Sequence, residues 1–198
     1  MTLEIKVLRG PDEITPAIQD IARLRIRVFR EWPYIYDGSQ ENEAEYLGHF
    51  AKSEDACVGL AIDDSEVIGA TTAEPMPDTH EDFRKPFTEA GIPTDKIFYF
   101  GESVLLSEHR GRGIGHAFFD LREQAARDWG ATLTAFCAVQ RPDDHPLKPE
   151  TYRPLDNFWR SRGYQSREDL ICHFPWKDLN EAEERYKPLM FWTRKLSQ

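Results

Sequence analysis

The stretch His109-Arg110-Gly111-Arg112-Gly113-Ile114-Gly115-His116 decides the fold, because a strand pattern precedes it and a helix pattern follows it. The aromatic and β-branched segment 98–106 is typical of a buried strand. The apolar residues after the stretch recur with the spacing of one helix face: Ile114, Ala117, Phe118, Leu121 and Ala125. The sequence therefore places three glycines at the turn between a strand and a helix.

Such a turn is predicted to bind an anion. The first N–H groups of a helix have no intrahelical partner, and the helix dipole is positive at this end. Glycines remove the side chains that would keep a phosphate away from those N–H groups. Arg110 and Arg112 add positive charge in a chain whose net charge is −10. We therefore expect a phosphorylated ligand at this loop, and a turn that binds nothing is the alternative.

The pattern of the loop narrows the choice of ligand. A dinucleotide fingerprint read from Gly111 requires glycine where His116 stands, and the Gly-Lys-Ser/Thr ending of a P-loop is missing from the stretch. The loop instead resembles motif A of the GCN5-related N-acetyltransferase (GNAT) superfamily, Gln/Arg-x-x-Gly-x-Gly/Ala, with Arg110, Gly113 and Gly115 at its defining positions. The resemblance implies that backbone amides wrap the pyrophosphate of acetyl-CoA, with these residues binding the co-substrate: Arg110, Gly111, Arg112, Gly113, Ile114, Gly115 and His116.

Composition sets outer limits on the function. A chain of 198 residues with 40% hydrophobic and 30% charged residues is typical of one globular domain, 1–198. Its net negative charge argues against a nucleic-acid partner.

The apolar runs are too short for a membrane span, and the first residues lack a signal-peptide pattern, so we expect no membrane partner and a cytoplasmic location. Cys57, Cys137 and Cys172 are expected to be reduced core residues, and the histidine spacing predicts no metal.

Hydrophobic periodicity predicts the order β-α-α-β-β-β-α-β-α-β-β. The insertion 74–96 contains four prolines and is expected to hold at most two short helical turns. Glu181 to Glu184 is predicted to be helical. The expected strands are 3–8, 56–62, 66–73, 98–106, 133–139, 169–174 and 189–195. The expected helices are 12–32, 41–50, 114–125 and a short one from 155 that ends at Gly163 as its C-cap.

This order is the topology that the resemblance implies, an α/β (α+β) fold in which helices flank a mixed, mostly antiparallel central sheet. A second run supports it loosely: Tyr152-x-x-Leu155-x-x-Phe158-Trp159 leads to Gly163-Tyr164. In the family a similar run ends in Phe-Tyr and Gly-Phe, and the resemblance implies that Phe158 contacts the co-substrate.

The resemblance also implies a set of catalytic groups. The strand before the loop diverges from its neighbour in the family, so backbone amides of Val104, Leu105 and Leu106 would meet the pantetheine arm and the thioester oxygen. An alkylammonium has a pKa of about 10.4 and must lose a proton before it attacks. Glu102 is the carboxylate within the apolar strand, and burial would raise its pKa toward that of a useful base. The alternative is that Glu102 is an edge residue or the partner of an arginine.

Trp159 stands where the family often has the tyrosine that protonates the departing thiolate. Either Tyr152 or Tyr164 replaces that tyrosine, or the thiolate leaves unassisted. A thiol pKa of about 8.5 makes unassisted departure chemically reasonable.

The acceptor site is expected around the connection between the first two helices, which contains Trp32, Tyr34 and Tyr36. These aromatic rings, with Glu41, Glu43 and Glu45 beyond them, suit an ammonium group. The alternative is that the rings only pack the end of the helix and that the glutamates are solvated. Two proline-rich loops, 74–96 and 140–152, are expected to close over the acceptor, with His145 as a candidate contact.

The hypothesis from the sequence is acetyl transfer from acetyl-CoA to a small-molecule or peptide amine by direct attack in a ternary complex, without a metal. One alternative is a non-catalytic domain that binds acyl-CoA. Another is a nucleotide-binding protein of a different fold. The late strands are expected to be exposed, which makes a homodimer reasonable.

Overall fold

A single mixed sheet forms the centre of the computed structural model, which describes residues 3–196 except for the side chains at positions 45 and 49. Its strands run in the order β1-β2-β3-β4-β5-β7-β6, and among them only β4 and β5 pair in parallel. The predicted α+β class with a mostly antiparallel sheet is confirmed. The strands are β1 (Leu3–Arg9), β2 (Cys57–Asp63), β3 (Glu66–Pro75), β4 (Ile97–Leu105), β5 (Leu133–Val139), β6 (Gln165–Trp176) and β7 (Arg185–Lys195).

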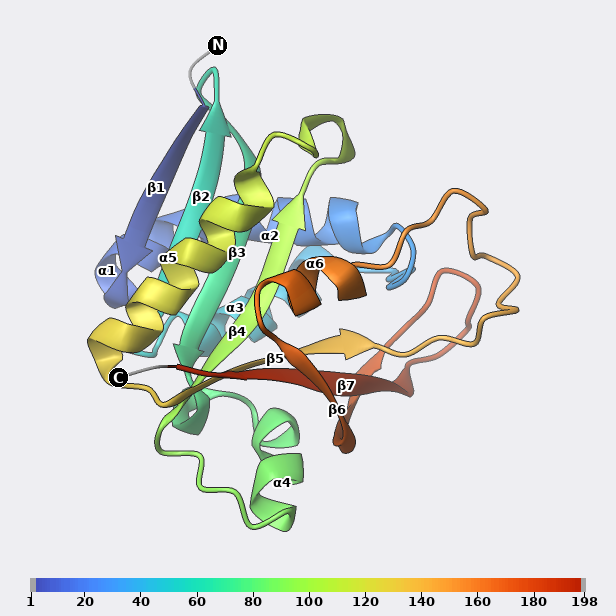
Figure 1. Cartoon of the computed structure of the whole chain (residues 1–198). Helices are drawn as coiled ribbons and strands as arrows, with labels where there is room; N and C mark the ends of the chain where they lie inside the picture. The colour runs from blue at the N-terminus through green and yellow to red at the C-terminus, as the bar shows by residue number, and fades with distance from the viewer. Residues whose placement is uncertain (1–2, 197–198) are drawn as a thin grey trace.

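Helices cover both faces of this sheet (Figure 1). One face carries α1 (Gly10–Ile14), the 3-10 helix η1 (Thr15–Ala17), α2 (Ile18–Phe29) and α3 (Gln40–Phe50). The other face carries α5 (Ile114–Trp129) and the short α6 (Asp156–Ser161). The remaining segments are η2 (Met76–Asp78), α4 (Glu81–Glu89) and η3 (Ser107–His109).

Apolar side chains form a core on each face. Leu24 of α2 and Leu47 of α3 pack with Val58 and Val104 on one side of the sheet. Rings of α5, β4, β5 and β7 pack on the other side: Phe98, Phe100, Phe119, Phe136 and Trp192. Burial of these side chains supplies the main driving force for the fold and fixes where α2 and α5 lie against β4.

Three elements differ from the prediction. The first helix begins at Gly10, passes into the 3-10 turn at Pro16, which has no N–H to donate, and ends at Phe29 instead of Trp32. The insertion holds a helix of 9 residues, α4, longer than expected for a segment with Pro86 inside it. Phe83 and Phe87 of α4 are buried on one side, and this packing offsets the backbone hydrogen bond that proline cannot make.

The segment from Glu181 to Glu184 is not helical, so that prediction is wrong. It is the last part of the connection between β6 and β7, which spans 177–184. Glu181 accepts hydrogen bonds from Lys187 Nζ at 2.5 Å and from the backbone amide of Asp178 at 3.3 Å. These contacts hold the chain in a turn, in place of the backbone bonds of a helix.

Candidate active site

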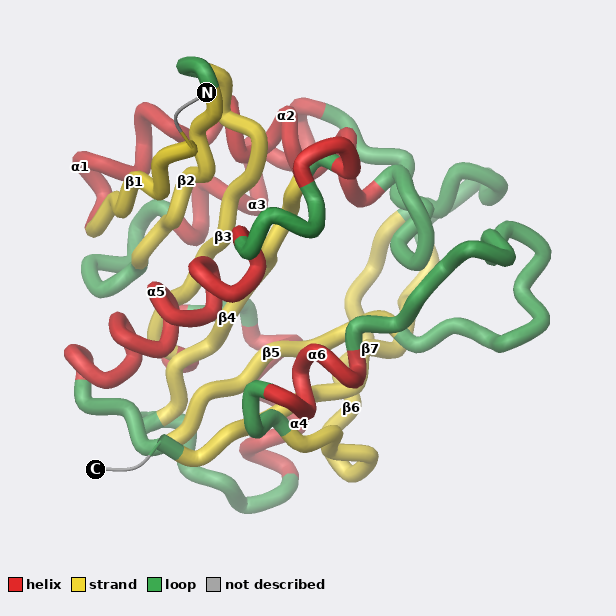
Figure 2. The backbone as a smooth tube through the Cα atoms, turned by 45° about the horizontal axis from the view of Figure 1, so that its top comes forward, coloured by secondary structure: helices red, strands yellow, loops and turns green. Residues whose placement is uncertain are grey.

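The strands β4 and β5 diverge next to the glycine loop. They pair only at Ile97 with Leu133, Phe98 with Thr134 and Tyr99 with Ala135. Beyond Tyr99, β4 stays paired with β3 and leaves β5, which pairs on its other side with β7 (Figure 2). The expected divergence is therefore present, and one edge of β4 is open toward β5.

The register of β4 decides which of its amides face this opening. The amide of Leu106 donates to the Ile68 carbonyl at 3.0 Å. Since hydrogen bonding alternates along an antiparallel pair, the Val104 amide also points to β3, at Ala70, and the Leu105 amide points away from it. The Leu106 amide is therefore not free, and the register gives the Val104 amide the same direction, toward β3.

A β-bulge in β4 places Glu102. Thr71 pairs with Ser103 but Ala73 pairs with Phe100, so Gly101 and Glu102 both lie opposite Thr72. The extra residue reverses the alternation of side chains, so Glu102 faces α2 although Phe100 faces α5. Thr72 Oγ1 accepts a hydrogen bond from the backbone amide of Glu102 at 3.1 Å. A Cβ atom on Gly101 would lie 2.5 Å from the same oxygen.

Replacing Gly101 by alanine is expected to destabilise the fold, because the new methyl group would displace the hydroxyl that holds the bulge. We expect the free energy of unfolding to fall by about 1–3 kcal/mol, measured by urea unfolding. Gly48→Ala is the matched control, because its Cβ would meet nothing within 4 Å in α3. That change should stabilise the helix by about 0.5–1 kcal/mol. Equal stability of Gly101→Ala and the wild type would contradict the role of the bulge.

Glu102 is both buried and paired with an arginine. Its Oε2 accepts a hydrogen bond from Arg25 Nη1 of α2 at 2.5 Å, and Arg25 Nε donates to Glu43 of α3. Glu102 Oε1 is buried and has no hydrogen-bond partner among the described residues. Burial raises the pKa of Glu102, the charge of Arg25 opposes that rise, and the charge of Glu43 adds to it. Glu102 is therefore the partner of an arginine, as one of the alternatives had it, and this pairing leaves one carboxylate oxygen without a partner among the described residues.

A second carboxylate, Glu74 of β3, lies in the same neighbourhood. It is 9% exposed, and its Oε2 has no partner among the described residues. Burial, with the charges of Asp78 and Glu102, raises the pKa of Glu74 to about 8. No pattern in the sequence separates this residue from any other glutamate in a strand.

The raised pKa of Glu74 makes the stability of the fold depend on pH. The folded chain binds this proton up to about pH 8, whereas the unfolded chain releases it near 4.5. Between these values the folded state binds more protons, so its stability falls as pH rises, by up to about 1.4 kcal/mol per pH unit. Thermal unfolding of Glu74→Gln, measured between about pH 4.5 and pH 8, is expected to lack the part of the fall in stability with pH that this carboxyl causes. Glu89→Gln, at an exposed site on α4, should keep it; equal slopes in the two variants would count against the prediction.

The glycine loop joins η3 to α5 and presents an unpaired backbone. Gly111 and Gly113 have φ values of +78° and +82°, which favour glycine. The amides of His116 and Ala117 donate to the Gly113 carbonyl. Among the described residues, the five amides before them, Gly111 to Gly115, have no acceptor. The loop therefore offers a run of N–H groups at the positive end of α5, as an anion site requires.

The two arginines of the loop are engaged elsewhere. Arg110 Nη2 lies 2.9 Å from Glu31 Oε2, and Arg112 Nη1 lies 2.6 Å from Asp63 Oδ2. The hydrogen bond from Arg112 lowers the pKa of Asp63. The sequence predicts that both arginines add positive charge to the loop, but each is paired with a carboxylate that balances its charge. The attraction for an anion therefore comes first from the backbone amides and the helix dipole.

The second motif reaches the loop through Phe158 of α6. The Phe158 ring lies 4.9 Å from the His116 ring, edge to face, and 3.7 Å from the position of a Cβ on Gly115. The structure thus brings this aromatic side chain to the first turn of α5, beside the unpaired amides. Phe158 forms a wall of the candidate anion site.

The tyrosines considered for protonating the thiolate have different surroundings. Tyr164 is buried, accepts from Thr134 Oγ1 at 3.1 Å and donates to Glu123 at 3.4 Å. Its pKa is raised, first by burial. Tyr164 is therefore held in the core, while Tyr152 is half-buried in the loop 140–152. Trp159 packs against Phe136 and Trp192.

The predicted acceptor residues meet other loops. The Trp32 ring lies 5.0 Å from the ring of His145 and 6.0 Å from that of Tyr152, so the loop 140–152 covers it. Tyr34 packs on Phe29 and Trp176. Tyr36 is partly buried, and the charge of Glu43 contributes to raising its pKa, after burial. Tyr34 and Tyr36 both border the aromatic cluster between α4 and β6.

Arg141 ties these loops together and was missed by sequence reasoning. Its buried guanidinium donates to the carbonyl oxygens of Pro33 at 2.9 Å and Tyr34 at 2.8 Å. It also contacts both carboxylate oxygens of Asp178, at 2.7 and 2.9 Å. An arginine just after a strand has no distinctive spacing, because its partners are distant in the sequence.

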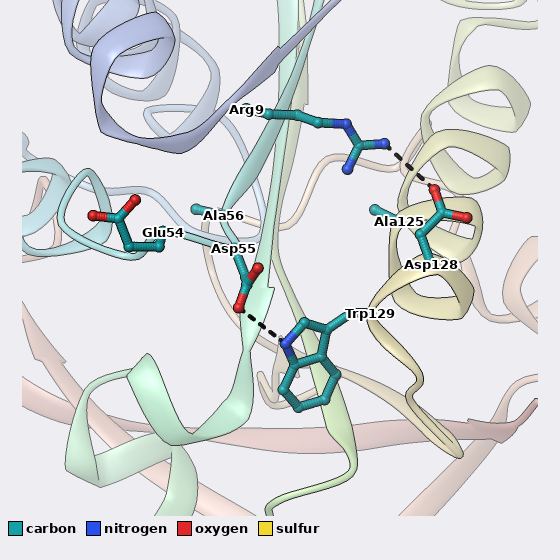
Figure 3. Close-up of a pocket in the computed structure, with 7 residues that line it drawn as sticks. All are labelled: Arg9, Glu54, Asp55, Ala56, Ala125, Asp128 and Trp129. Atoms are coloured by element: carbon teal, nitrogen blue, oxygen red, sulfur yellow. Dashed lines mark hydrogen bonds and ion pairs between the residues drawn. The ribbon is translucent and has the colours of Figure 1, made fainter.

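A hollow of about 180 Å³ lies at the far end of α5 (Figure 3). Arg9 approaches Asp128 to 3.7 Å and Trp129 donates to Asp55 at 3.2 Å across it. The helix between this hollow and the glycine loop spans about 20 Å. Glu54 also lines the hollow, so its charged lining consists of three carboxylates and one arginine. The hollow is therefore unsuited to phosphates.

Two kinds of feature are missing from the described part of the chain, residues 3–196. No cluster of three or more His, Cys, Asp or Glu residues suited to a metal ion occurs in this part. Within it, no helix has the length and apolar character needed to cross a bilayer.

Comparisons with known proteins agree with this geometry. The sequence model of the Acetyltransferase (GNAT) family matches residues 19–148. Curated proteins include no match to this chain. Among solved structures, a GCN5-related N-acetyltransferase from Kribbella flavida is 18% identical, with 97% of this chain and 98% of that chain covered and a TM-score of 0.58.

Two other solved structures cover nearly the whole chain. A ribosomal-protein-alanine N-acetyltransferase from Brucella melitensis is 14% identical, over 96% of this chain and 99% of its own, with a TM-score of 0.60. A polyamine N-acetyltransferase from Drosophila melanogaster, which forms N-acetylagmatine, is 12% identical, over 98% of this chain and 100% of its own, also with a TM-score of 0.60. At these identities the likeness concerns the fold.

Proposed function

The chain belongs to the acetyltransferase (GNAT) family, and on this premise we propose that it transfers the acetyl group of acetyl-CoA to an amine by direct attack in a ternary complex. The alternative of a nucleotide-binding protein with another fold is wrong. Acetyl-CoA would supply the activated acyl group as a thioester, and the residues of the chain would orient it and remove the proton of the amine.

The observation that carries the proposal is the run of unpaired amides from Gly111 to Gly115 beside the divergence of β4 and β5. These amides would hold the pyrophosphate, with Phe158 as a wall. Open space at the Cβ positions of Gly111 and Gly113 fits a close approach of phosphate oxygens. The binding energy of this remote part of the ligand would orient the reacting carbonyl.

Two groups of β4 would act on the reacting atoms. The Leu105 amide, which points into the divergence, would donate to the thioester oxygen, and such a donor is worth about a hundredfold or more in rate. Glu102 Oε1, buried and unpartnered, would take the proton of the amine. The departing thiolate is then protonated by Tyr152 or leaves unassisted.

The surroundings of Glu102 suit a cationic acceptor. Glu102 and Glu43 share Arg25, so these three side chains together carry a net negative charge when both carboxyls are ionised. The rings of Tyr36 and Tyr46 border the same group, and such rings attract an ammonium group. We propose a small-molecule or peptide amine as the acceptor, with Tyr34 and Tyr36 beside these charged residues and Trp32 under the loop 140–152.

The test is release of free CoA thiol from acetyl-CoA in the presence of a panel of amines. An acetyltransferase releases thiol with at least one amine and gives an N-acetylated product by mass spectrometry. A non-catalytic CoA-binding domain would gain thermal stability from acetyl-CoA but release no thiol with any amine. That second result would overturn the proposed function.

A further inference from the structure

We propose that Arg25 and Glu43 are positioning residues for Glu102: Arg25 fixes one carboxylate oxygen, and Glu43, by sharing the guanidinium, sets how readily the other oxygen accepts the acceptor's proton. This inference rests on the proposed function, because it concerns the same proton transfer.

Arg25 is held on several sides. Its side chain is 11% exposed, with Nη1 2.5 Å from Glu102 Oε2 and Nε on Glu43. The guanidinium carbon lies 4.3 Å from the centre of the Tyr46 ring and 5.0 Å from that of the Phe29 ring. A planar guanidinium fixed in this way determines the orientation of the Glu102 carboxylate.

That orientation separates the two oxygens of Glu102. Oε2 is bound to Arg25, and Oε1 is buried without a partner among the described residues. Most buried polar atoms in proteins are hydrogen-bonded, so an unpartnered buried oxygen indicates a missing donor. An ammonium group of the acceptor supplies such a donor. The geometry thus assigns the proton transfer to Oε1.

Glu43 opposes the effect of Arg25 on Glu102. A guanidinium next to a carboxylate favours its ionised form and makes it a weaker base. Glu43 places a second carboxylate on the same guanidinium, and its charge raises the pKa of Glu102. Other groups act on Glu102 from the elements packed around it: Tyr34 before α3, Tyr46 on α3, Thr72 and Glu74 on β3, and Arg122 on α5. These groups are unchanged in the variants below.

The experiment is the pH dependence of kcat/KM for thiol release in variants of these two residues, because this profile reports the pKa of the base in the free enzyme. Glu43→Gln leaves the charge of Arg25 to Glu102 alone, so the acidic limb should move down by about one pH unit. Arg25→Met removes the cation, so the limb should move up by about one pH unit or more. Arg25→Lys keeps the positive charge, so its acidic limb should lie close to that of the wild type.

The controls separate this role from a structural one. Arg27→Met removes another ion pair of α2, with Glu108 at 2.8 Å, and both partners of that pair are about half exposed. It should leave the limb in place. If the two residues were only structural, Glu43→Gln and Arg25→Met would have lower rates, but their acidic limbs would not move or would move in the same direction. Either result overturns the proposal. If Arg25→Met does not fold, the double variant Arg25→Met/Glu43→Gln replaces it and should still shift upward.

A readout without turnover distinguishes this proposal from the proposed function. The carboxyl signal of Glu102 in a protein labelled with ¹³C-glutamate, assigned by its loss in Glu102→Gln, gives the pKa directly. The same opposite shifts in Glu43→Gln and Arg25→Met are expected there. Absence of thiol release with every amine would overturn the proposed function, and unchanged ¹³C titrations would overturn the role of Arg25 and Glu43.

Discussion

Glu102→Gln is expected to lower kcat for acetyl transfer by about 100-fold or more at neutral pH, because the amide cannot take a proton from the amine. Glutamine has nearly the same shape and still offers an oxygen to Arg25, so the loss reports proton transfer more than packing. The defect should shrink as pH approaches the pKa of the free amine, about 10.4, where the nucleophile is already neutral. Steady-state thiol release across pH, with saturating acetyl-CoA, measures both effects.

Two controls accompany this variant. Glu108→Gln changes an exposed carboxylate shortly after the same strand and should keep wild-type kcat. Binding of acetyl-CoA to Glu102→Gln, measured by calorimetry, should also be unchanged. Turnover of Glu102→Gln close to that of the wild type from about pH 6 to pH 9 would show that another group is the base.

The second large effect is expected for Gly113→Val, which should weaken binding of acetyl-CoA by about 10- to 100-fold. Gly113 has φ +82° immediately before α5, and a β-branched residue strongly disfavours this conformation. Relief of the strain is expected to change the orientation of the neighbouring amides of Arg112 and Ile114. Isothermal calorimetry with acetyl-CoA measures the loss. Arg110→Ala is expected to matter less, because Arg110 is bound to Glu31.

Gly91→Val is the matched control for this variant. Gly91 also has a positive φ, +69°, and open space around its Cβ position, but it follows α4, away from the loop. Both valine variants should lose stability to a similar degree, and only Gly113→Val should lose affinity. Equal affinity of the two variants would contradict the assignment of the loop to the co-substrate.

Local patterns predicted the framework of this site. The strand before the loop, the three glycines and the apolar face of α5 are features of adjacent residues, so periodicity and spacing reveal them. The family resemblance then implied the divergence of β4 and β5, which the pairing confirms.

The details of the site depend on distant residues and were not predictable in this way. The bulge at Gly101 is visible only from the register with Thr72, and the same pairing with β3 engages the amide of Leu106. Arg112 has its partner 49 positions away, at Asp63, and Arg141 has Asp178 37 positions away. One sequence without its contacts does not indicate which carboxylate neutralises which arginine.

The proline-rich insertion shows a competition between local and tertiary preferences. Pro86 lowers the helix propensity of 81–89, and the sequence predicted only short turns there. Phe83 stacks on Tyr99 and Phe174, and Phe87 meets Phe191 edge to face. These contacts come from strands that are far apart in the sequence, and together they outweigh the local cost.

The short pairing of β4 with β5 means that the sheet consists of two antiparallel halves joined by a narrow seam. One half comprises β1 to β4 and the other β5, β7 and β6, and three residue pairs connect them through the backbone. Side chains also bridge the halves: Phe119 of α5 packs against Phe100 of β4 and against Phe136 of β5. Because cores resist changes of volume, we expect a smaller or larger side chain at 119 to change the angle between the halves, and with it the width of the opening that a thioester would enter.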